Sequence, residues 1–139
     1  MTQTQIVTSA DISVSAAQAL VQKGVDQALK AQKNLSFAVV DRAGYLVAFA
    51  RMDKAALVTV DVAIGKAHAA AFLKGPSKGF EDMINSGSPS MATVPNVLPL
   101  QGGMPILYNG QIVGAIGVSG SSGDDDQATA AALAGSFQP

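Results

Sequence analysis

The chain has 139 residues, a formal net charge of −1, no cysteine and 48% hydrophobic residues. This length predicts a single domain over residues 1–139 that can bury a hydrophobic core. A charge near zero without a basic run excludes electrostatic binding of nucleic acid. The absence of cysteine excludes disulfides, thiolate metal sites and a cysteine nucleophile.

The sequence gives no sign of a membrane segment. No apolar run approaches the ~20 residues that span a bilayer, and residues 1–10 lack the pattern of a signal peptide. We therefore expect a cytoplasmic protein without a membrane partner. Because the weak net charge gives little repulsion between copies, it favours a homo-oligomer.

The first third of the chain predicts an arm and a helix. Residues 1–10 form a flexible arm, with an edge strand at residues 5–8. Asp11 or Ser13 caps a helix that runs to about residue 32. Apolar side chains recur in it at helical spacing, at Val14, Ala17, Val21, Val25 and Ala28.

Two β-hairpins are predicted. Residues 35–40 and 45–51 pair through the turn 41–44, in which Gly44 takes a positive φ. Residues 104–108 and 111–118 pair through Asn109-Gly110, a strong type I′ turn signal. Glycines at 114, 117 and 120 indicate a close approach by a helix, a subunit or a ligand.

Helices and a long loop separate and follow the hairpins. A helix runs from residue 58 or 59 to Leu73, and Ser77 caps a short third helix that runs through residue 84. Residues 85–101 form a loop whose length indicates a functional or interface role. Asp124-Asp125-Asp126 begin a terminal helix as a solvated cap that its dipole favours. The order predicts an α+β domain with an antiparallel sheet and helices on one face.

Two residues are candidates for catalysis. His68, the single histidine, is an axial haem ligand, a metal ligand or a general base, or else a surface or interface residue. Asp41 is a proton carrier, or it accepts turn amide hydrogens. The same choice between proton transfer and packing applies to Tyr45 and Tyr108.

Five further residues are candidates for ligand binding. Lys66 is an anion partner or a solvated side chain, and Arg51 clamps an anion or pairs with a nearby aspartate. The amides of Gly102 and Gly103 cradle an anion or simply begin the hairpin. Met104 lines an adaptable apolar pocket or fills the core.

Several segments together resemble the GlcG/HbpS family of haem-binding or haem-degrading domains. They are residues 38–44, 51–53, 63–70, 100–106 and 114–120, and the resemblance covers about residues 12–135. The chain is also similar to the C-terminal domain of PduO-type cobalamin adenosyltransferases. The resemblance implies a profilin-like or PAS-like fold, with a five-stranded antiparallel sheet packed against helices, and a homo-oligomer. Some members bind haem, and the family commonly has threonine at the position of Ala69.

Three functions follow as hypotheses. The first is binding of haem, or of another planar carboxylate-bearing small molecule, between the second helix, the loop and the second hairpin. His68 is then the ligand to the haem iron. The second is a cofactor-independent isomerase, lyase or hydratase acting on a small catabolic metabolite. The third is a non-catalytic accessory or sensor module.

Overall fold

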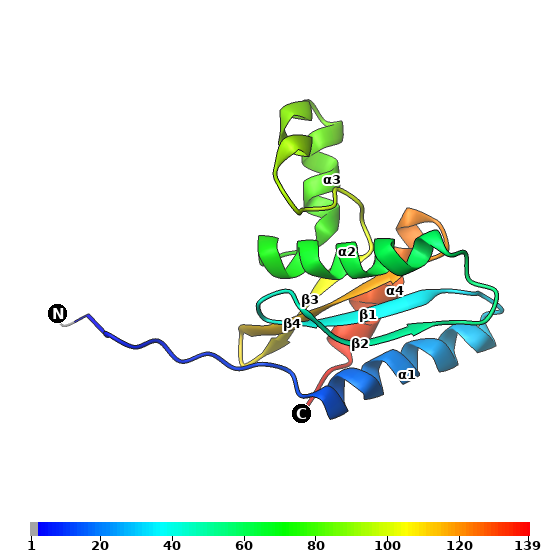
Figure 1. Cartoon of the computed structure of the whole chain (residues 1–139), viewed down its shortest axis with the longest axis horizontal. Helices are drawn as coiled ribbons and strands as arrows, with labels where there is room; N and C mark the ends of the chain where they lie inside the picture. Colours follow the sequence, from blue (N-terminus) through cyan, green and yellow to red (C-terminus); the bar gives the residue numbers. More distant parts are fainter. Residues whose placement is uncertain (1–2) are drawn as a thin grey trace.

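Four antiparallel strands form the sheet of this protein, in the order β2-β1-β4-β3. The computed structural model describes residues 3–139. The strands are β1 (Ser36–Asp41), β2 (Leu46–Arg51), β3 (Gly103–Tyr108) and β4 (Gln111–Ser119). The helices are α1 (Val14–Lys30), α2 (Val58–Leu73), α3 (Ser77–Asn85), the 3₁₀ helix η1 (Pro89–Thr93) and α4 (Gly123–Gly135). The α+β class is confirmed (Figure 1), but the fifth strand is wrong for residues 3–139.

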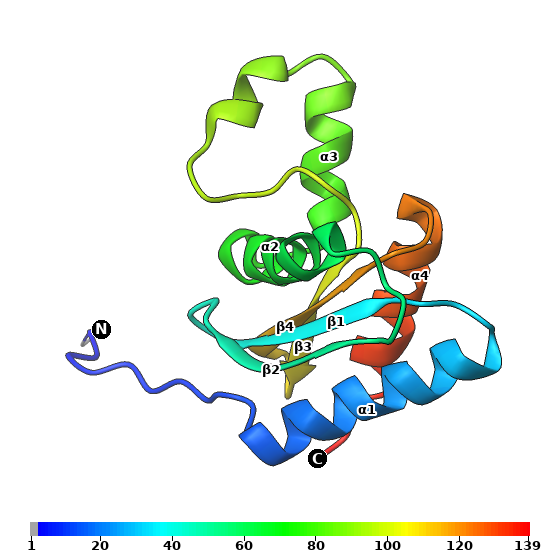
Figure 2. The same cartoon turned by 45° about the vertical axis from the view of Figure 1, so that its right-hand side comes forward.

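Helices cover both faces of the sheet. α1 and α4 lie against one face and α2 lies against the other (Figure 2). The prediction that all helices share one face is therefore wrong. The physical reason lies in β1, where five consecutive residues from Ser36 to Val40 are buried, so both faces of this strand are covered.

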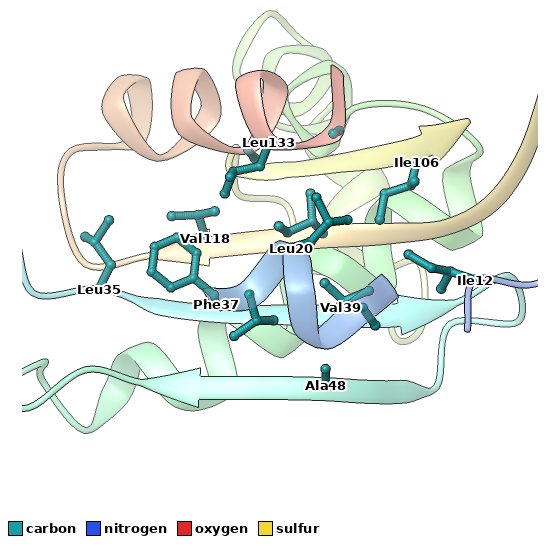
Figure 3. Close-up of a cluster of buried hydrophobic side chains, with 14 of the residues drawn as sticks. Ile12, Leu20, Leu35, Phe37, Val39, Ala48, Ile106, Val118 and Leu133 are labelled. Atoms are coloured by element: carbon teal, nitrogen blue, oxygen red, sulfur yellow. The ribbon is translucent and has the colours of Figure 1, made fainter. Parts of the chain in front are cut away.

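The larger core fills the space between the sheet and helices α1 and α4 (Figure 3). Phe37, Val39 and Val118 point into it from the central strands, and Leu20 and Leu133 reach it from the helices. All five side chains are buried. This core supplies most of the large apolar side chains that stabilise the domain.

The second core lies under α2 and is built from small side chains. Ala63, Ala67 and Ala70 of the helix pack against Ala38, Val40 and Ala115 of the sheet. Gly117 and Gly103 are partners across β4 and β3. A Cβ on Gly117 would lie 2.0 Å from the carbonyl oxygen of Ala63, and one on Gly103 would lie 2.1 Å from that of Lys66. The close approach expected at Gly117 is thus made by a helix.

A third cluster holds α3 and the following loop beside α2. Ala69, Phe80 and Val97 are its buried members. In both views this segment stands out from the body of the domain (Figures 1 and 2). The predicted loop 85–101 contains η1, because Pro89 stands at the start of a short helical turn.

The helix boundaries follow local capping. Ser13 caps α1 by accepting a hydrogen bond from the amide of Ala16, as predicted, and the helix ends at Lys30. Ser77 is the first residue of α3 rather than its cap, and its hydroxyl accepts the amide hydrogen of Gly103. No helix within residues 3–139 has the length and apolar character needed to cross a bilayer.

Residues 3–11 are extended and leave the domain beyond the hairpin turns (Figure 1). The predicted strand at residues 5–8 is absent, so that prediction is wrong for the single chain. A strand needs a neighbouring edge for its backbone groups, and none lies beside this arm. The first two residues of the predicted arm 1–10 lie outside the described residues.

Candidate functional site near His68

A hydrogen bond across 24 residues fixes the imidazole of His68. The ring nitrogen Nδ1 lies 2.8 Å from the carbonyl oxygen of Gly44, in the turn between β1 and β2. Because a carbonyl only accepts, Nδ1 carries the hydrogen in this contact, and the neutral ring has its lone pair on Nε2. Within residues 3–139, Nε2 has no hydrogen-bond partner. The residue is only partly buried, and a neutral imidazole nitrogen without a hydrogen-bond partner is a potential metal ligand.

The turn is shaped to make this contact. Gly44 has φ +94°, a conformation that side chains rarely adopt. A Cβ at this position would lie 2.9 Å from Nδ1 of His68 and 3.0 Å from the ring of Phe72. Asp41 holds the turn, because its Oδ1 accepts the amide hydrogen of Tyr45 at 2.9 Å. Glycine is therefore needed at position 44 for the hairpin to contact the histidine.

One aromatic side chain packs against the imidazole. Phe72 follows one helical turn later, with its ring centroid 4.0 Å from that of His68 at an interplanar angle of 41°. The phenyl ring of Phe72 is 52% exposed, and Tyr45 in the turn is 73% exposed. Leu46 and Leu73 are exposed close by in the sequence. We call Tyr45, Leu46 and Phe72 the apolar surface beside His68.

A hollow of about 430 Å³ opens between the C-terminal part of α2 and the turn that joins β1 to β2. Ala71, one helical turn from His68, lies in its wall, and so do the basic residues Arg42 and Lys74. The rest of the wall comes from arm residues 7–10 and from residues 110–112 of the second hairpin. Two cations and no carboxylate line this hollow, so it suits an anionic group.

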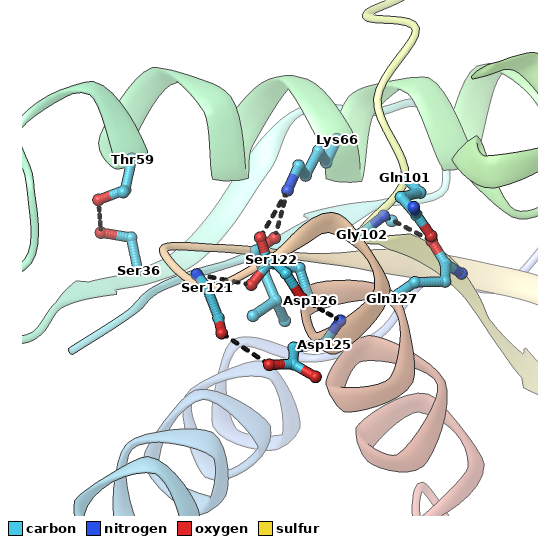
Figure 4. Close-up of polar contacts among 12 residues, drawn as sticks. Ser36, Thr59, Lys66, Gln101, Gly102, Ser121, Ser122, Asp125, Asp126 and Gln127 are labelled. Carbon is cyan, nitrogen blue, oxygen red and sulfur yellow. Dashed lines mark hydrogen bonds and ion pairs between the residues drawn. The ribbon is translucent and has the colours of Figure 1, made fainter. Parts of the chain in front are cut away.

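Lys66 is buried in the interior and forms an ion pair there. Its side chain is 4% exposed, and Nζ lies 3.0 Å from Oδ2 of Asp126 and 2.9 Å from the carbonyl oxygen of Val118. Asp126 also accepts the amide hydrogen of Ser121 (Figure 4). This buried pair joins α2 to the first turn of α4. The prediction of a solvated Lys66 is therefore wrong, and so is that of a fully solvated acidic cap.

The other two aspartates of the cap are exposed, and they differ in their surroundings. A hydrogen bond from the hydroxyl of Ser121 and the ammonium of Lys33 lower the pKa of Asp125 below its ordinary value. Asp124 accepts a hydrogen bond from the side chain of Gln101. Among residues 3–139, no three histidine, aspartate or glutamate side chains come together as a metal site.

The amides of Gly102 and Gly103 have acceptors within the chain. The amide of Gly102 donates to the side-chain oxygen of Gln127, and that of Gly103 donates to the hydroxyl of Ser77 at 2.8 Å. A Cβ on Gly102 would lie 2.7 Å from Nζ of Lys66. Gly102 leaves room for the side chain of Lys66, and Gly103 leaves room for its backbone carbonyl. In this conformation neither amide is free to hold a ligand.

Comparison with known proteins identifies the chain. The family model described as "Haem degrading protein HbpS-like" matches residues 12–134. The chain belongs to the HbpS-like family. It is 38% identical over 108 residues to Protein GlcG of Escherichia coli strain K12, covering 78% of this chain and 81% of the relative.

Solved structures show the same fold as this HbpS-like chain. A double mutant of HbpS from Streptomyces reticuli is 30% identical, with a TM-score of 0.88 over 100% of this chain and 95% of the other. The protein ORFY of Klebsiella pneumoniae is 25% identical, with a TM-score of 0.87 over 99% of this chain and 100% of the other. These likenesses cover the arm and the helices as well as the sheet.

The predicted site residues of the HbpS-like chain do not line one pocket. His68 and Asp41 are brought together at the β1–β2 turn. Arg51 lies at the far end of β2, five residues from its start, which is about 17 Å along the strand. Met104 packs against the core on the opposite face of the sheet from α2.

The hollow between α2 and the loop is separate from His68. It measures about 350 Å³, is wide open, and is lined by Asp61, Gly65 and residues 94 and 96–99. Leu98 packs onto Gly65 there. Tyr45 and Tyr108 are largely exposed, so the prediction that their rings are packed inside is wrong.

Sequence reasoning missed three residues at the C-terminal part of α2 and the neighbouring turn. Phe72 stands four residues later on the helix, a spacing that places two side chains on one face and could have been noticed. Arg42 and Lys74 gave no such signal. They lie 32 residues apart in the sequence, and only the folding of the hairpin turn against α2 brings them to one hollow.

Proposed function

We propose that this protein binds haem, with Nε2 of His68 as the axial ligand to the iron. The observation that carries the proposal is the hydrogen bond from Nδ1 of His68 to the carbonyl oxygen of Gly44. A histidine that ligates a metal usually donates its other ring hydrogen to a carbonyl or carboxylate, which fixes the tautomer and the ring orientation. His68 has this arrangement before any ligand arrives.

The surroundings of His68 fit a planar ligand that carries carboxylates. The apolar surface beside His68 offers Phe72 and Tyr45 to the faces and edges of a porphyrin ring. Arg42 and Lys74 stand at the adjacent hollow, where they can pair with carboxylate side groups. Arg42 and Lys74 replace Lys66 and Arg51 in the anion-binding role. When bound, haem supplies an iron centre for redox and small-ligand chemistry.

The departure from the family at Ala69 lies outside this site. The methyl group of Ala69 is fully buried in the cluster with Phe80 and Val97, beside α3. A threonine hydroxyl at this position would enter that cluster and not the surface beside His68. The description of the family as haem-degrading supports haem as the ligand.

A haemin titration tests the proposal. We expect the wild-type protein to give a saturable, stoichiometric Soret shift, and His68→Ala to bind haemin at least about tenfold more weakly without the spectrum of a histidine complex. The exposed variant Lys78→Met serves as a control that leaves the spectrum intact. A His68→Ala protein with an unchanged spectrum would show that His68 is not the ligand.

A second variant tests whether haemin binding depends on the orientation of the His68 ring as well as on its presence. Gly44→Ala places a Cβ against Nδ1 of His68, so we expect weaker haemin binding although the imidazole remains. Gly87→Ala is the matched control, because Gly87 also has a positive φ, +124°, but open space around it. Equal haemin affinities of the two variants would contradict the orienting role of Gly44.

A cofactor-independent enzyme is the second candidate. The hollow with Arg42 and Lys74 would hold the carboxylate of a small metabolite, and His68 would carry a proton at Nε2. Thermal stabilisation by small carboxylic acids, lost in a double Arg42→Gln and Lys74→Gln variant, would favour this candidate if haemin fails to bind.

A further inference from the structure

One edge of the sheet is open for pairing. The amide of Met52 donates to the carbonyl oxygen of Leu35, and Ala50 and Ala48 lie opposite Phe37 and Val39. The backbone groups of an antiparallel strand point alternately toward and away from its neighbour. Phe49 and Arg51 therefore present their amide hydrogens and carbonyl oxygens to the outer edge of β2.

The edge of β2 has little protection against pairing. Proteins usually block exposed edges with proline, with charged side chains or with bulges. From Ala48 to Arg51 the strand has no proline and no glycine, and its single charge is at its last residue. Its one bulge lies at the other end, between Leu46 and Ala48. Within residues 3–139, no hydrogen bond reaches the outward groups of Phe49 and Arg51.

The opposite edge of the sheet, β3, is blocked. The amide of Val118 donates to the carbonyl oxygen of Gly102, so the alternate residues Gly103 and Pro105 face outward. The amide of Gly103 already donates to the hydroxyl of Ser77. Pro105 has no amide hydrogen. The two edges thus differ, and β2 is the one that can accept another strand.

The N-terminal arm has the composition of a strand without a partner. Residues 3–10 contain four β-branched residues, Thr4, Ile6, Val7 and Thr8, and no charge, glycine or proline. Ile6 is 77% exposed and Val7 is 86% exposed. The first described backbone group with a hydrogen-bond partner is the amide of Ile12, which donates to Val113. An uncharged, β-branched segment of this kind favours pairing with a sheet edge.

We propose that the arm of one copy adds as a strand to the β2 edge of a second copy, with residues 5–8 beside residues 48–51. Each arm then supplies the fifth strand that the single chain lacks. In a strand, Ile6 and Val7 point to opposite faces. One of them continues the core against α1 and the other lies beside Phe49 on the α2 side. Reciprocal exchange gives a dimer with two-fold symmetry.

The geometry favours pairing of the arm with the β2 edge of a second copy over pairing with the β2 edge of its own chain. Both views show the arm running away from the sheet, beyond the hairpin turns (Figures 1 and 2). To reach its own β2 edge, the chain would have to reverse direction before Asp11 and Ile12. These residues are fixed by hydrogen bonds to Arg42 and Val113, and residues 3–13 contain no glycine or proline for a tight turn.

Amide hydrogen exchange tests the pairing. In the intact protein we expect the amides of Phe49 and Arg51 to exchange at least about tenfold more slowly than in a protein lacking residues 2–10. The inward amides of Ala48 and Ala50 serve as internal controls, with equal protection in both proteins. Equal exchange of the outward amides in the two proteins, fast or slow, would overturn the proposal.

Cross-linking tests whether the arm crosses between copies. Because the chain has no cysteine, a protein with Ile6→Cys and a protein with Arg51→Cys each carry one thiol. After subunits of the two proteins are mixed and treated with a short cross-linker that has two thiol-reactive ends, we expect a covalently linked dimer on a denaturing gel. Leu57→Cys replaces Ile6→Cys as the control, because Leu57 is 73% exposed against 77% for Ile6, and it should give no pair with Arg51→Cys. Failure of Ile6→Cys to exceed this control would overturn the exchange between copies.

Discussion

Replacing Gly117 with alanine is expected to destabilise the domain by about 3 kcal/mol or more, the upper range for overpacked cores. The new Cβ would lie 2.0 Å from the carbonyl oxygen of Ala63 and 2.6 Å from the amide nitrogen of Ala67. Both contacts are with backbone atoms of α2, which cannot rotate away as a side chain can. The helix would have to lift from the sheet, and the small-residue core beneath it would open.

Urea denaturation followed by circular dichroism measures this loss. Gly79→Ala is the matched control, because no atom lies within 4 Å of a Cβ at Gly79 in α3. Alanine in a helix is favoured over glycine by about 1 kcal/mol, so this control should be unchanged or slightly more stable. A Gly117→Ala protein as stable as the wild type would contradict the close packing of α2 on β4.

The two hairpins could be predicted from the sequence because their signals are local. Asn109 and Gly110 both have positive φ, at 49° and 75°, as a type I′ turn requires. Gly44 likewise has the positive φ expected in the first turn. Such preferences act within four residues, so they can be recognised without knowing what the turn contacts.

The partners of buried polar groups could not be predicted in this way. Lys66 reads as a surface residue in an alanine-rich helix, and its partner Asp126 stands 60 residues later in a run of three aspartates. Nothing local separates the buried aspartate from its two exposed neighbours. The glycines at 102 and 103 were noticed, but only the fold reveals that the side chain of Lys66 approaches Gly102 and its backbone carbonyl approaches Gly103.

In the candidate site, too, local features could be predicted from the sequence and long-range contacts could not. His68 was found because it is the single histidine, whereas its orientation depends on a turn 24 residues earlier. Arg51 looked suitable as an anion partner because it ends a strand, but the strand carries it away from α2's C-terminal end. Residue type therefore pointed to His68 as a candidate, whereas the packing of the hairpin turn on α2 brings Arg42 and Lys74 to one hollow.

Replacing Lys66 with methionine is expected to cost about 3–5 kcal/mol, because it leaves the carboxylate of Asp126 buried without its counter-ion. Asp126 would keep only the hydrogen bond from the amide of Ser121. The carbonyl oxygen of Val118 would lose its ammonium donor as well. Since most domains are stable by about 5–15 kcal/mol, this change removes a large share of the stability.

A double variant tests whether the unpaired charge of Asp126 causes the lost stability of Lys66→Met. Lys66→Met combined with Asp126→Leu removes both charges, and paired replacement of this kind is often nearly neutral, so we expect much of the stability to return. Lys78→Met is the matched control, because Lys78 pairs with Asp82 on the surface and should leave the urea midpoint unchanged. If the double variant were as unstable as Lys66→Met alone, the unpaired charge of Asp126 would not be the cause of the lost stability.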